Sequence, residues 1–200
     1  TRPMLDPDTA LEFLRQRRSI RNFRDELVPE EKIRQLLEAA RFAPTAANSQ
    51  GMYYLVIQDR DLIKKITDCV ADWMQEQIDN KSPQKRYFIK VLHVYRERGI
   101  DIIGRNARQL IFVLARRLNV TGPSNSEQSL AYAELYAPTL GLGTTIMGFI
   151  ETCLRADYTP LRELLQIPTK QVGVGCLLVG YPRYRYHKLV DRQHLKVEFR

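Results

Sequence analysis

The chain has 200 residues, of which 44% are hydrophobic and 27% charged, and its formal net charge is +8 at pH 7. This length and composition indicate one globular domain with a proper core, and they exclude a disordered or low-complexity protein. The longest apolar runs, residues 110–115 and 172–179, are too short to cross a bilayer. Since the first residues also lack the apolar core of a signal peptide, we expect a cytoplasmic protein.

The cysteines and the positive charge limit further which functional classes of protein fit this chain. Cys69, Cys153 and Cys176 are too scattered for a CxxC site, and an odd number argues against a disulfide framework, so we expect core thiols and no metal site. Clustered basic residues favour nucleic acid because they release counterions from phosphates. Here the basic residues are interleaved with acids, and no nucleic-acid motif is visible. A surface that suits small anions explains the charge equally well.

The first predicted helix precedes the densest basic cluster. Thr9 and Glu12 have the spacing of a capping box, which predicts a helix start there. Residues 17–23 follow, with the sequence RRSIRNF. Guanidinium groups match phosphate oxygens two at a time, so Arg17 and Arg21, separated by Ser19, could hold a phosphate monoester. A solvated basic turn at a helix C-terminus would look the same.

A second predicted helix leads into a polar loop. It begins at Pro29, its apolar residues recur at helical spacing, and it must end before Pro44. Residues 44–51 are small and polar, and residues 53–57 read as a strand. Asn48 and Gln50 each offer a donor and an acceptor, which suits the edge of a flat heterocycle. Such residues are also ordinary turn formers.

The middle of the chain predicts helices over residues 61–80 and 84–98, with Trp73 on the core side and His93 on the surface. Residues 110–115 read as a central strand. A capping box at Ser124 and Glu127 predicts a helix that runs towards residue 140. In this helix Glu134 could be a buried acid with a functional role, although an exposed or satisfied carboxylate is the simpler interpretation.

The last third contains a glycine-rich segment, residues 141–148, which departs from the helix and could bring backbone close to a planar ligand, although helix C-caps look alike. A short helix over residues 160–165 and a buried strand over residues 172–179 follow. The basic, aromatic tail from residue 181 has little apolar periodicity, so we expect it to lie across another surface, such as a partner subunit.

Four segments, in this order and spacing, resemble the FMN-dependent nitroreductase family, and the resemblance extends over nearly the whole chain. They are residues 17–23, 44–50, 141–148, and 179–182 with the basic tail. The resemblance implies an α+β fold with a mixed sheet flanked by helices, built as an intertwined homodimer with two flavin sites at the interface. It also implies a single domain over residues 1–200, with a variable helical excursion at about 73–103.

The family pattern assigns site residues by position. It puts Arg17 and Ser19 at the FMN phosphate and ribityl chain, with Arg18 beside them, and Arg21 near the pyrimidine carbonyl. Lys188 and Arg192 would complete the phosphate site. Two further sets would contact the flavin, the first from the opposite subunit and the second against the ring: Pro44, Thr45, Ala46, Asn48 and Gln50; Thr145, Ile146, Met147 and Gly148. Gly51 and Met52 replace the proline and aromatic residue that the family often has after the glutamine.

The resemblance also implies the chemistry. Flavin N5 would carry the hydride, with NADH or NADPH as donor and a small nitroaromatic, quinone or related electron-poor acceptor, in a ping-pong mechanism. No side chain is needed as a catalytic group, although Arg21 would give electrostatic support. Two alternatives stay open: a flavoenzyme of the same fold with a dedicated reaction, such as reductive dehalogenation or flavin fragmentation, and a basic binding module without flavin. We expect no nucleic-acid or membrane partner.

Overall fold

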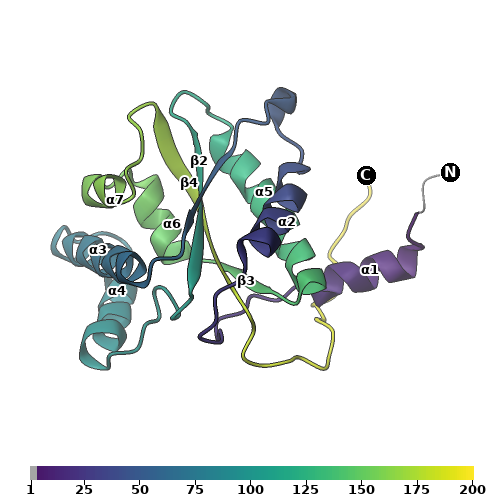
Figure 1. The fold of residues 1–200 in the computed structure, drawn as a ribbon, viewed down its shortest axis with the longest axis horizontal. Coiled ribbons are helices and arrows are strands. Elements are labelled where there is room, and N and C mark those ends of the chain that lie inside the picture. The colour runs from purple at the N-terminus through teal and green to yellow at the C-terminus, as the bar shows by residue number, and fades with distance from the viewer. Residues whose placement is uncertain (1–3) are drawn as a thin grey trace.

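The computed structural model describes residues 4–200 and has three layers, with a sheet between two groups of helices (Figure 1). The sheet has the order β1-β2-β4-β3, and its strands are β1 (Tyr53–Ile57), β2 (Gln109–Arg116), β3 (Gly143–Ile146) and β4 (Gln171–Gly180). All pairings between these strands are antiparallel, and the one parallel pairing among the described residues is an isolated bridge between Ser19 and Thr144. The predicted α+β class is confirmed.

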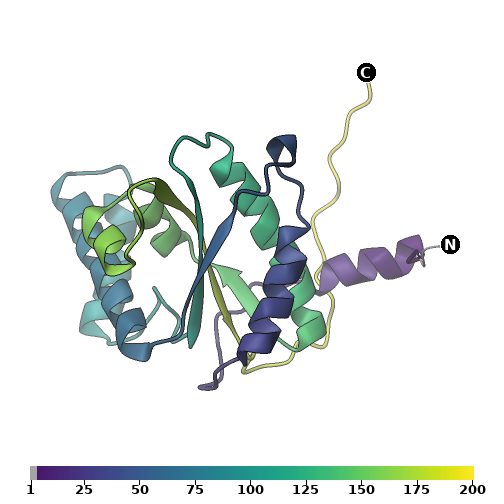
Figure 2. The ribbon, with the colours of Figure 1, turned by 45° about the horizontal axis from the view of Figure 1, so that its top comes forward.

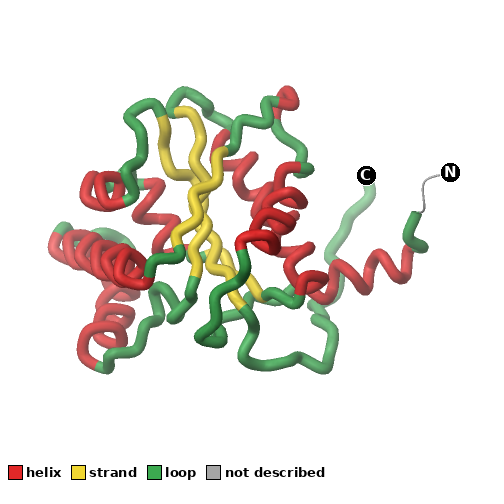
Figure 3. Tube along the Cα trace, viewed as in Figure 1, coloured by secondary structure: helices red, strands yellow, loops and turns green. Residues whose placement is uncertain are grey.

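The helices divide between the two faces of the sheet (Figure 3). On one face lie α2 (Glu30–Arg41) and α5 (Gly122–Tyr136), and on the other lie α3 (Arg60–Asp79), α4 (Lys85–Leu92), α6 (Gly148–Arg155) and α7 (Thr159–Leu164). The remaining helix, α1 (Pro7–Gln16), projects away from the body in two views (Figure 2), and none of its residues is buried. None of the helices in the described chain is both long and apolar enough to span a membrane.

Alternation along β2 explains why the sheet is covered on both sides. Leu110, Phe112 and Leu114 face the cluster beneath α3, α4, α6 and α7, whereas Ile111 and Val113 face the cluster beneath α2 and α5. Successive strand residues point to opposite faces, so a continuous apolar run serves two cores. The predicted central strand is therefore confirmed.

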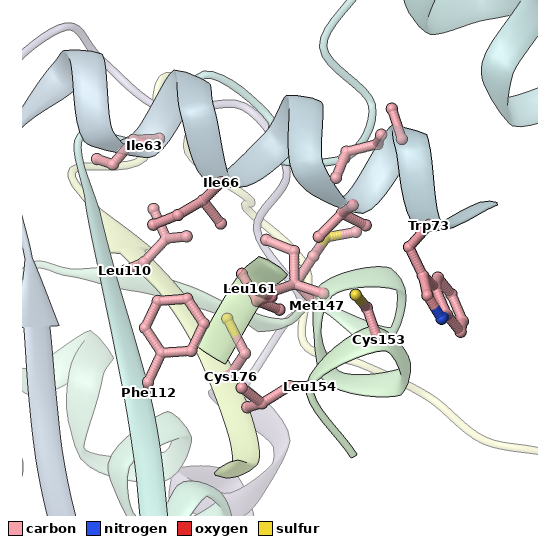
Figure 4. Packing of buried hydrophobic residues seen from close by; sticks show 14 of the residues in the cluster. Ile63, Ile66, Trp73, Leu110, Phe112, Met147, Cys153, Leu154, Leu161 and Cys176 are labelled. Carbon is pink, nitrogen blue, oxygen red and sulfur yellow. The ribbon is translucent and has the colours of Figure 1, made fainter. Parts of the chain in front are cut away.

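The larger of the two hydrophobic clusters, beneath α3, α4, α6 and α7, includes much of the segment 73–103 that was predicted as a helical excursion. Trp73 is 6% exposed and packs edge-to-face on Phe88, with ring centroids 5.6 Å apart. Figure 4 shows Trp73 near Cys153, and Cys176 further along the same cluster. Cys153 and Cys176 are buried as expected, while Cys69 is partly exposed. The division into a core and a variable excursion remains a prediction.

Both predicted capping boxes are wrong. α1 begins at Pro7, because the Asp6 carboxylate accepts hydrogen bonds from the N–H groups of Asp8 and Thr9 at 3.1 and 3.0 Å. An aspartate N-cap followed by proline is the stronger start signal. Likewise α5 begins at Gly122, with Pro123 in its first turn, and the Ser124 hydroxyl donates to the Thr121 carbonyl instead of capping.

The segment over residues 141–148 is also more regular than expected. Gly141, at φ 71°, ends a 3₁₀ turn after α5, and β3 then pairs with the last residues of β4. A four-residue edge strand followed at once by α6 leaves no periodicity to detect. This strand fixes the backbone on which the basic cluster rests.

Candidate functional site

The segment of residues 17–21 is held in extended form against β3. The Ile20 N–H donates to the Thr144 carbonyl at 2.8 Å, and Ile20 is buried. The contact requires a glycine on the strand, because a Cβ on Gly143 would lie 2.6 Å from Ile20 Cγ1. In an extended segment alternate residues share a side, so Arg17, Ser19 and Arg21 fall together. The fold thereby assembles the predicted phosphate-binding residues.

A buried carboxylate lies beneath this cluster. Glu134 of α5 is 7% exposed; its Oε2 is 3.5 Å from Arg17 Nη1, and its Oε1 accepts from the Thr144 hydroxyl at 3.4 Å. Burial raises the pKa of Glu134, although Arg17, the Thr144 hydroxyl and Arg21 act in the opposite direction. The ion pair is longer than a good charge-assisted bond, so Arg17 keeps donors for a ligand. Its helical spacing from Leu130 could have shown that Glu134 faces the core.

Arg105 is a further cation that sequence reasoning missed. It is partly buried, and burial lowers its pKa, with the charge of nearby Arg21 as the next cause. Its φ of 57° is left-handed, and its buried Nε has no hydrogen-bond partner within the described chain. Two guanidinium groups that repel each other indicate a place where an anion or an electron-rich carbonyl would be stabilised.

The loop over residues 44–50 is exposed and strained. Ala47, Asn48 and Gln50 have φ values of 52°, 51° and 50°, which L-residues seldom adopt. The Ala46 N–H donates to Asn125 Oδ1 at 3.1 Å, and the Gln50 N–H donates to the Thr45 hydroxyl at 3.1 Å. Gln50 Nε2 donates to Asn48 Oδ1 at 3.2 Å, so the two predicted amides lie together. Pro44 is exposed beside them.

One chain does not bring this loop to the arginine cluster. The loop is tied to Asn125 near the start of α5, whereas Arg17 pairs with Glu134 nearer its end. Nine residues of α-helix separate these anchors by roughly 13 Å. A single ligand that contacts both sets within one chain would therefore have to extend along nine of the fifteen residues of α5.

The predicted ring-contacting residues continue from β3 into α6. Thr145 and Met147 are buried, whereas Ile146 and Gly148 are exposed, and the Met147 N–H donates to the Cys176 carbonyl at 3.1 Å. Their strand also carries Thr144, which holds Ile20. They therefore share a support with Arg17 and Ser19.

The tail reaches the same region through Arg18. Arg18 Nη2 donates to the Lys188 carbonyl at 2.6 Å, and its guanidinium lies 4.6 Å from the centroid of the Tyr186 ring. A cavity of about 540 Å³ opens here, with Arg18, Lys188 and Glu134 in its lining. Arg17, Ser19 and Arg21 are not among its described lining residues, because alternate residues of the extended segment point to the other side. Arg192 is exposed, and the structure shows no contact between its side chain and the described cluster. The donor set of guanidinium groups, hydroxyls and strand backbone suits a phosphorylated ring such as FMN.

Comparisons with known proteins bear on the family and the fold of this chain. Residues 14–181 match the model of the nitroreductase family. The chain is 27% identical over 179 residues to FMN reductase (NAD(P)H) of Bacillus subtilis, covering 90% of this chain and 68% of that protein. It is 26% identical over 179 residues to iodotyrosine deiodinase 1 of Mus musculus, covering 86% of this chain and 61% of that protein.

Solved structures show the same fold. A nitroreductase with bound FMN from Desulfitobacterium hafniense superposes with a TM-score of 0.74 at 18% identity, covering 98% of this chain and 100% of that chain. An iodotyrosine deiodinase bound to FMN and 3-iodo-L-tyrosine gives 0.72 at 19% identity, covering 95% and 98%.

Proposed function

The chain belongs to the nitroreductase family, and we propose that it is an FMN-dependent oxidoreductase that passes electrons from NADH or NADPH to nitroaromatics, quinones or related electron-poor rings. The observation that carries this proposal is the placement of Arg17, Ser19 and Arg21 on one side of a segment that is bridged to β3, next to the buried Glu134. The name of the Bacillus subtilis relative supports a nicotinamide donor.

Each part of the cluster has a distinct role in the proposal. Arg17 and Ser19, with Arg18, would bind the phosphate and ribityl chain, and Lys188 and Arg192 would complete the phosphate site. When bound, FMN supplies a ring that accepts and donates a hydride at N5. Arg21 would stabilise negative charge on the pyrimidine edge, and residues 145–148 would lie against the ring and exclude water.

The direct test is spectroscopic. We expect purified protein to be yellow, or to become yellow with added FMN, and to bleach when NADH or NADPH is added without oxygen. Bleached protein should recover its colour when a nitroaromatic or a quinone is added, with saturation kinetics of the ping-pong type. A protein that stays colourless with excess FMN would overturn the proposal.

We also propose that the active form is a homodimer whose sites are shared between chains. The separation of the two predicted sets along α5 supports this, since a second copy could bring its Asn48 loop to the arginine cluster of the first. Exposed apolar side chains on α1 and the tail support it too, because Leu11 and Phe199 are 55% and 91% exposed.

A mixing experiment tests the shared site. Arg17→Ala would damage the part of the site formed by the arginine cluster. Asn48→Gly would damage the part formed by the loop, while glycine keeps the left-handed backbone accessible. Neither variant alone should bind FMN well. If equal amounts are unfolded and refolded together, about a quarter of the sites would combine two intact halves, by random pairing in a twofold dimer. No recovery in the mixture, or a protein that sediments as a monomer, would contradict the shared site.

Reductive dehalogenation is a second candidate for the reaction. It is favoured by the likeness to the deiodinase of Mus musculus and to the structure that holds 3-iodo-L-tyrosine. Stopped-flow reoxidation of the reduced protein separates the candidates: oxidation by iodotyrosine with release of iodide would favour dehalogenation, and oxidation by nitroaromatics or quinones alone would favour the first proposal.

A further inference from the structure

A second cationic site lies where the N-terminal end of α3 meets the turn before β2. It is a pocket of about 710 Å³, which we call the arginine pocket. Five cationic side chains line it: Arg24, Arg60, Lys64, Arg108 and Arg183. Among its described lining residues the carboxylates are Asp25 and Asp101. Asp68, outside the lining, forms an ion pair with Lys64, and the four arginines still outnumber the two lining carboxylates. The pocket therefore carries excess positive charge.

Both carboxylates are already engaged. The Asp101 oxygens accept the N–H groups of the next turn, Oδ1 from Ile103 and Gly104 at 3.1 and 2.7 Å and Oδ2 from Asn106 at 2.9 Å. Asp101 thus stabilises the turn, and among the described residues it forms no ion pair with the arginines that line the pocket.

Asp25 holds two guanidinium groups together. Its Oδ1 accepts from Arg108 Nη1 at 2.6 Å and also from Arg60 Nη2. These bonds lower the pKa of Asp25, with the Arg60 bond first and the Arg108 bond next, so the carboxylate stays ionised. Exposed pairs of this kind add little stability, and one carboxylate between two guanidinium groups still leaves a positive charge. The arrangement orients donors more than it stabilises the fold.

Other donors in the pocket are unused. Arg108 Nε is buried without a hydrogen-bond partner within the described chain. Arg24 and Arg183 form no ion pair among the described residues, while their backbones are fixed by bonds from Arg24 N–H to the Tyr181 carbonyl (2.8 Å) and from Arg183 N–H to the Asn22 carbonyl (2.9 Å). Unpaired guanidinium groups that extend from an anchored backbone, beside an oriented pair, offer the kind of donors that match phosphate oxygens.

We propose that the arginine pocket binds a phosphate group of an organic ligand, in addition to the FMN phosphate. The turn that supplies Arg108 also carries Arg105, which neighbours Arg21, so the pocket adjoins the proposed flavin site. The phosphate has two possible sources, the 2′-phosphate of NADPH or a separate phosphorylated small molecule. The first source rests on the proposed function, whereas the second does not.

The binding test uses full-length protein saturated with FMN, so that the FMN site is filled. Adenosine 2′-monophosphate and inorganic phosphate are titrated calorimetrically into wild type, Arg60→Gln and Arg183→Gln. Each substitution removes a charge-assisted donor, so binding should weaken about tenfold or more. Arg34→Gln and Arg98→Gln are matched controls: Arg34 is an exposed helical arginine paired with Glu30, and Arg98 is exposed outside the pocket. Both should bind like wild type.

Kinetics then identify the source. If the KM for NADPH rises about tenfold in Arg60→Gln and Arg183→Gln while the KM for NADH is unchanged, the donor phosphate occupies the pocket. If both KM values are unchanged but the calorimetric loss persists, a separate phosphorylated ligand does. The proposal is overturned if neither probe binds, or if the pocket variants bind like the controls. A protein that binds no flavin would end the proposed function, yet the same titration would still judge the pocket.

Discussion

The candidate ligand-binding residues near the two ends of α5 differ in charge and in backbone geometry. At the Glu134 end, the side chains of Arg17 and Arg21 extend from a segment that is bridged to β3 and has no left-handed residue, and a buried carboxylate lies beneath them. At the Asn125 end, amide side chains stand on a loop whose backbone is left-handed at three residues. Charge placed on a rigid element needs no strain, whereas neutral donors on a loop are positioned by strain. The first end therefore should supply the larger part of the affinity, and the second should add a smaller part and fix the orientation of the ligand.

The largest effect is expected at the charged end. Arg17→Ala should weaken FMN binding by about tenfold to a hundredfold, because a charge-assisted hydrogen bond to phosphate contributes about 1.5 to 3 kcal/mol. Fluorescence titration of FMN measures the change. Arg34→Ala, which removes an exposed arginine on α2, is the control and should bind FMN normally.

Arg17→Ala also leaves Glu134 without its cation, so a second variant is needed to separate binding from folding. Arg17→Ala/Glu134→Gln removes the buried charge as well. If the double variant regains wild-type FMN affinity, the loss came from a damaged fold and the role assigned to Arg17 is wrong.

The next effect concerns the strand that supports the cluster. A Cβ on Gly143 would lie 2.6 Å from Ile20 Cγ1 and 2.9 Å from Pro182 Cγ, too close for real contacts. Gly143→Ala should therefore lower the free energy of unfolding by about 1 to 3 kcal/mol, the usual cost of overpacking. Urea denaturation measures it, and Gly51→Ala is the control, since a Cβ there has nothing nearer than 3.8 Å. Equal effects in the two variants would contradict tight support by β3.

A smaller effect should appear as pH dependence at Glu134. Because burial raises its pKa above the ordinary 4.5, the folded protein loses stability as pH rises from about that value through the raised pKa. Glu134→Gln removes this loss, so the variant should gain stability relative to wild type over that interval, and the gain should level off at higher pH. Thermal melts of FMN-free protein between acid and neutral pH measure the difference. A stability difference that does not change with pH would show that folding leaves the pKa of Glu134 at its ordinary value.

The sequence predicted the charged end better than the amide end. The basic cluster itself suggested a phosphate site at Arg17, Ser19 and Arg21, with a solvated basic turn as the alternative, and the resemblance to the family assigned the role of each residue. The structure brings the three together, since alternate residues of an extended segment share a side. The strand that holds them was missed, because four residues carry no detectable period and the pairing with β4 is a distant contact. Family membership is confirmed by the match over residues 14–181, whereas the contacts of each site residue with a flavin remain predictions.

Other misses have similar causes. The spacing of Glu134 from Leu130 indicates a core-facing position, but its pairing with Arg17, like the proximity of Arg105 to Arg21, depends on neighbours far along the chain, which no local pattern encodes. The helix starts were misplaced because Asp6 and Pro123 outweighed the Thr9 and Ser124 motifs. The helices and central strands, which have long apolar periods, were predicted within a few residues. Local sequence patterns thus predict the helices and strands, whereas the residues of the site are brought together by contacts between distant parts of the chain.

The smallest expected effect lies at the amide end and tests whether strain is stored there. Ala47 has φ 52° and ψ 27° and is exposed, so Ala47→Gly should raise the free energy of unfolding by about 0.4 to 1 kcal/mol by relieving a left-handed alanine. Ala46→Gly, at a neighbour with ordinary φ, should lower it instead. Urea denaturation of both variants makes the comparison. If Ala47→Gly is stabilising and also weakens FMN binding, the loop gives up stability to hold Asn48 and Gln50 in place. If Ala47→Gly is destabilising, the loop is unstrained and the two ends of α5 do not differ in this way.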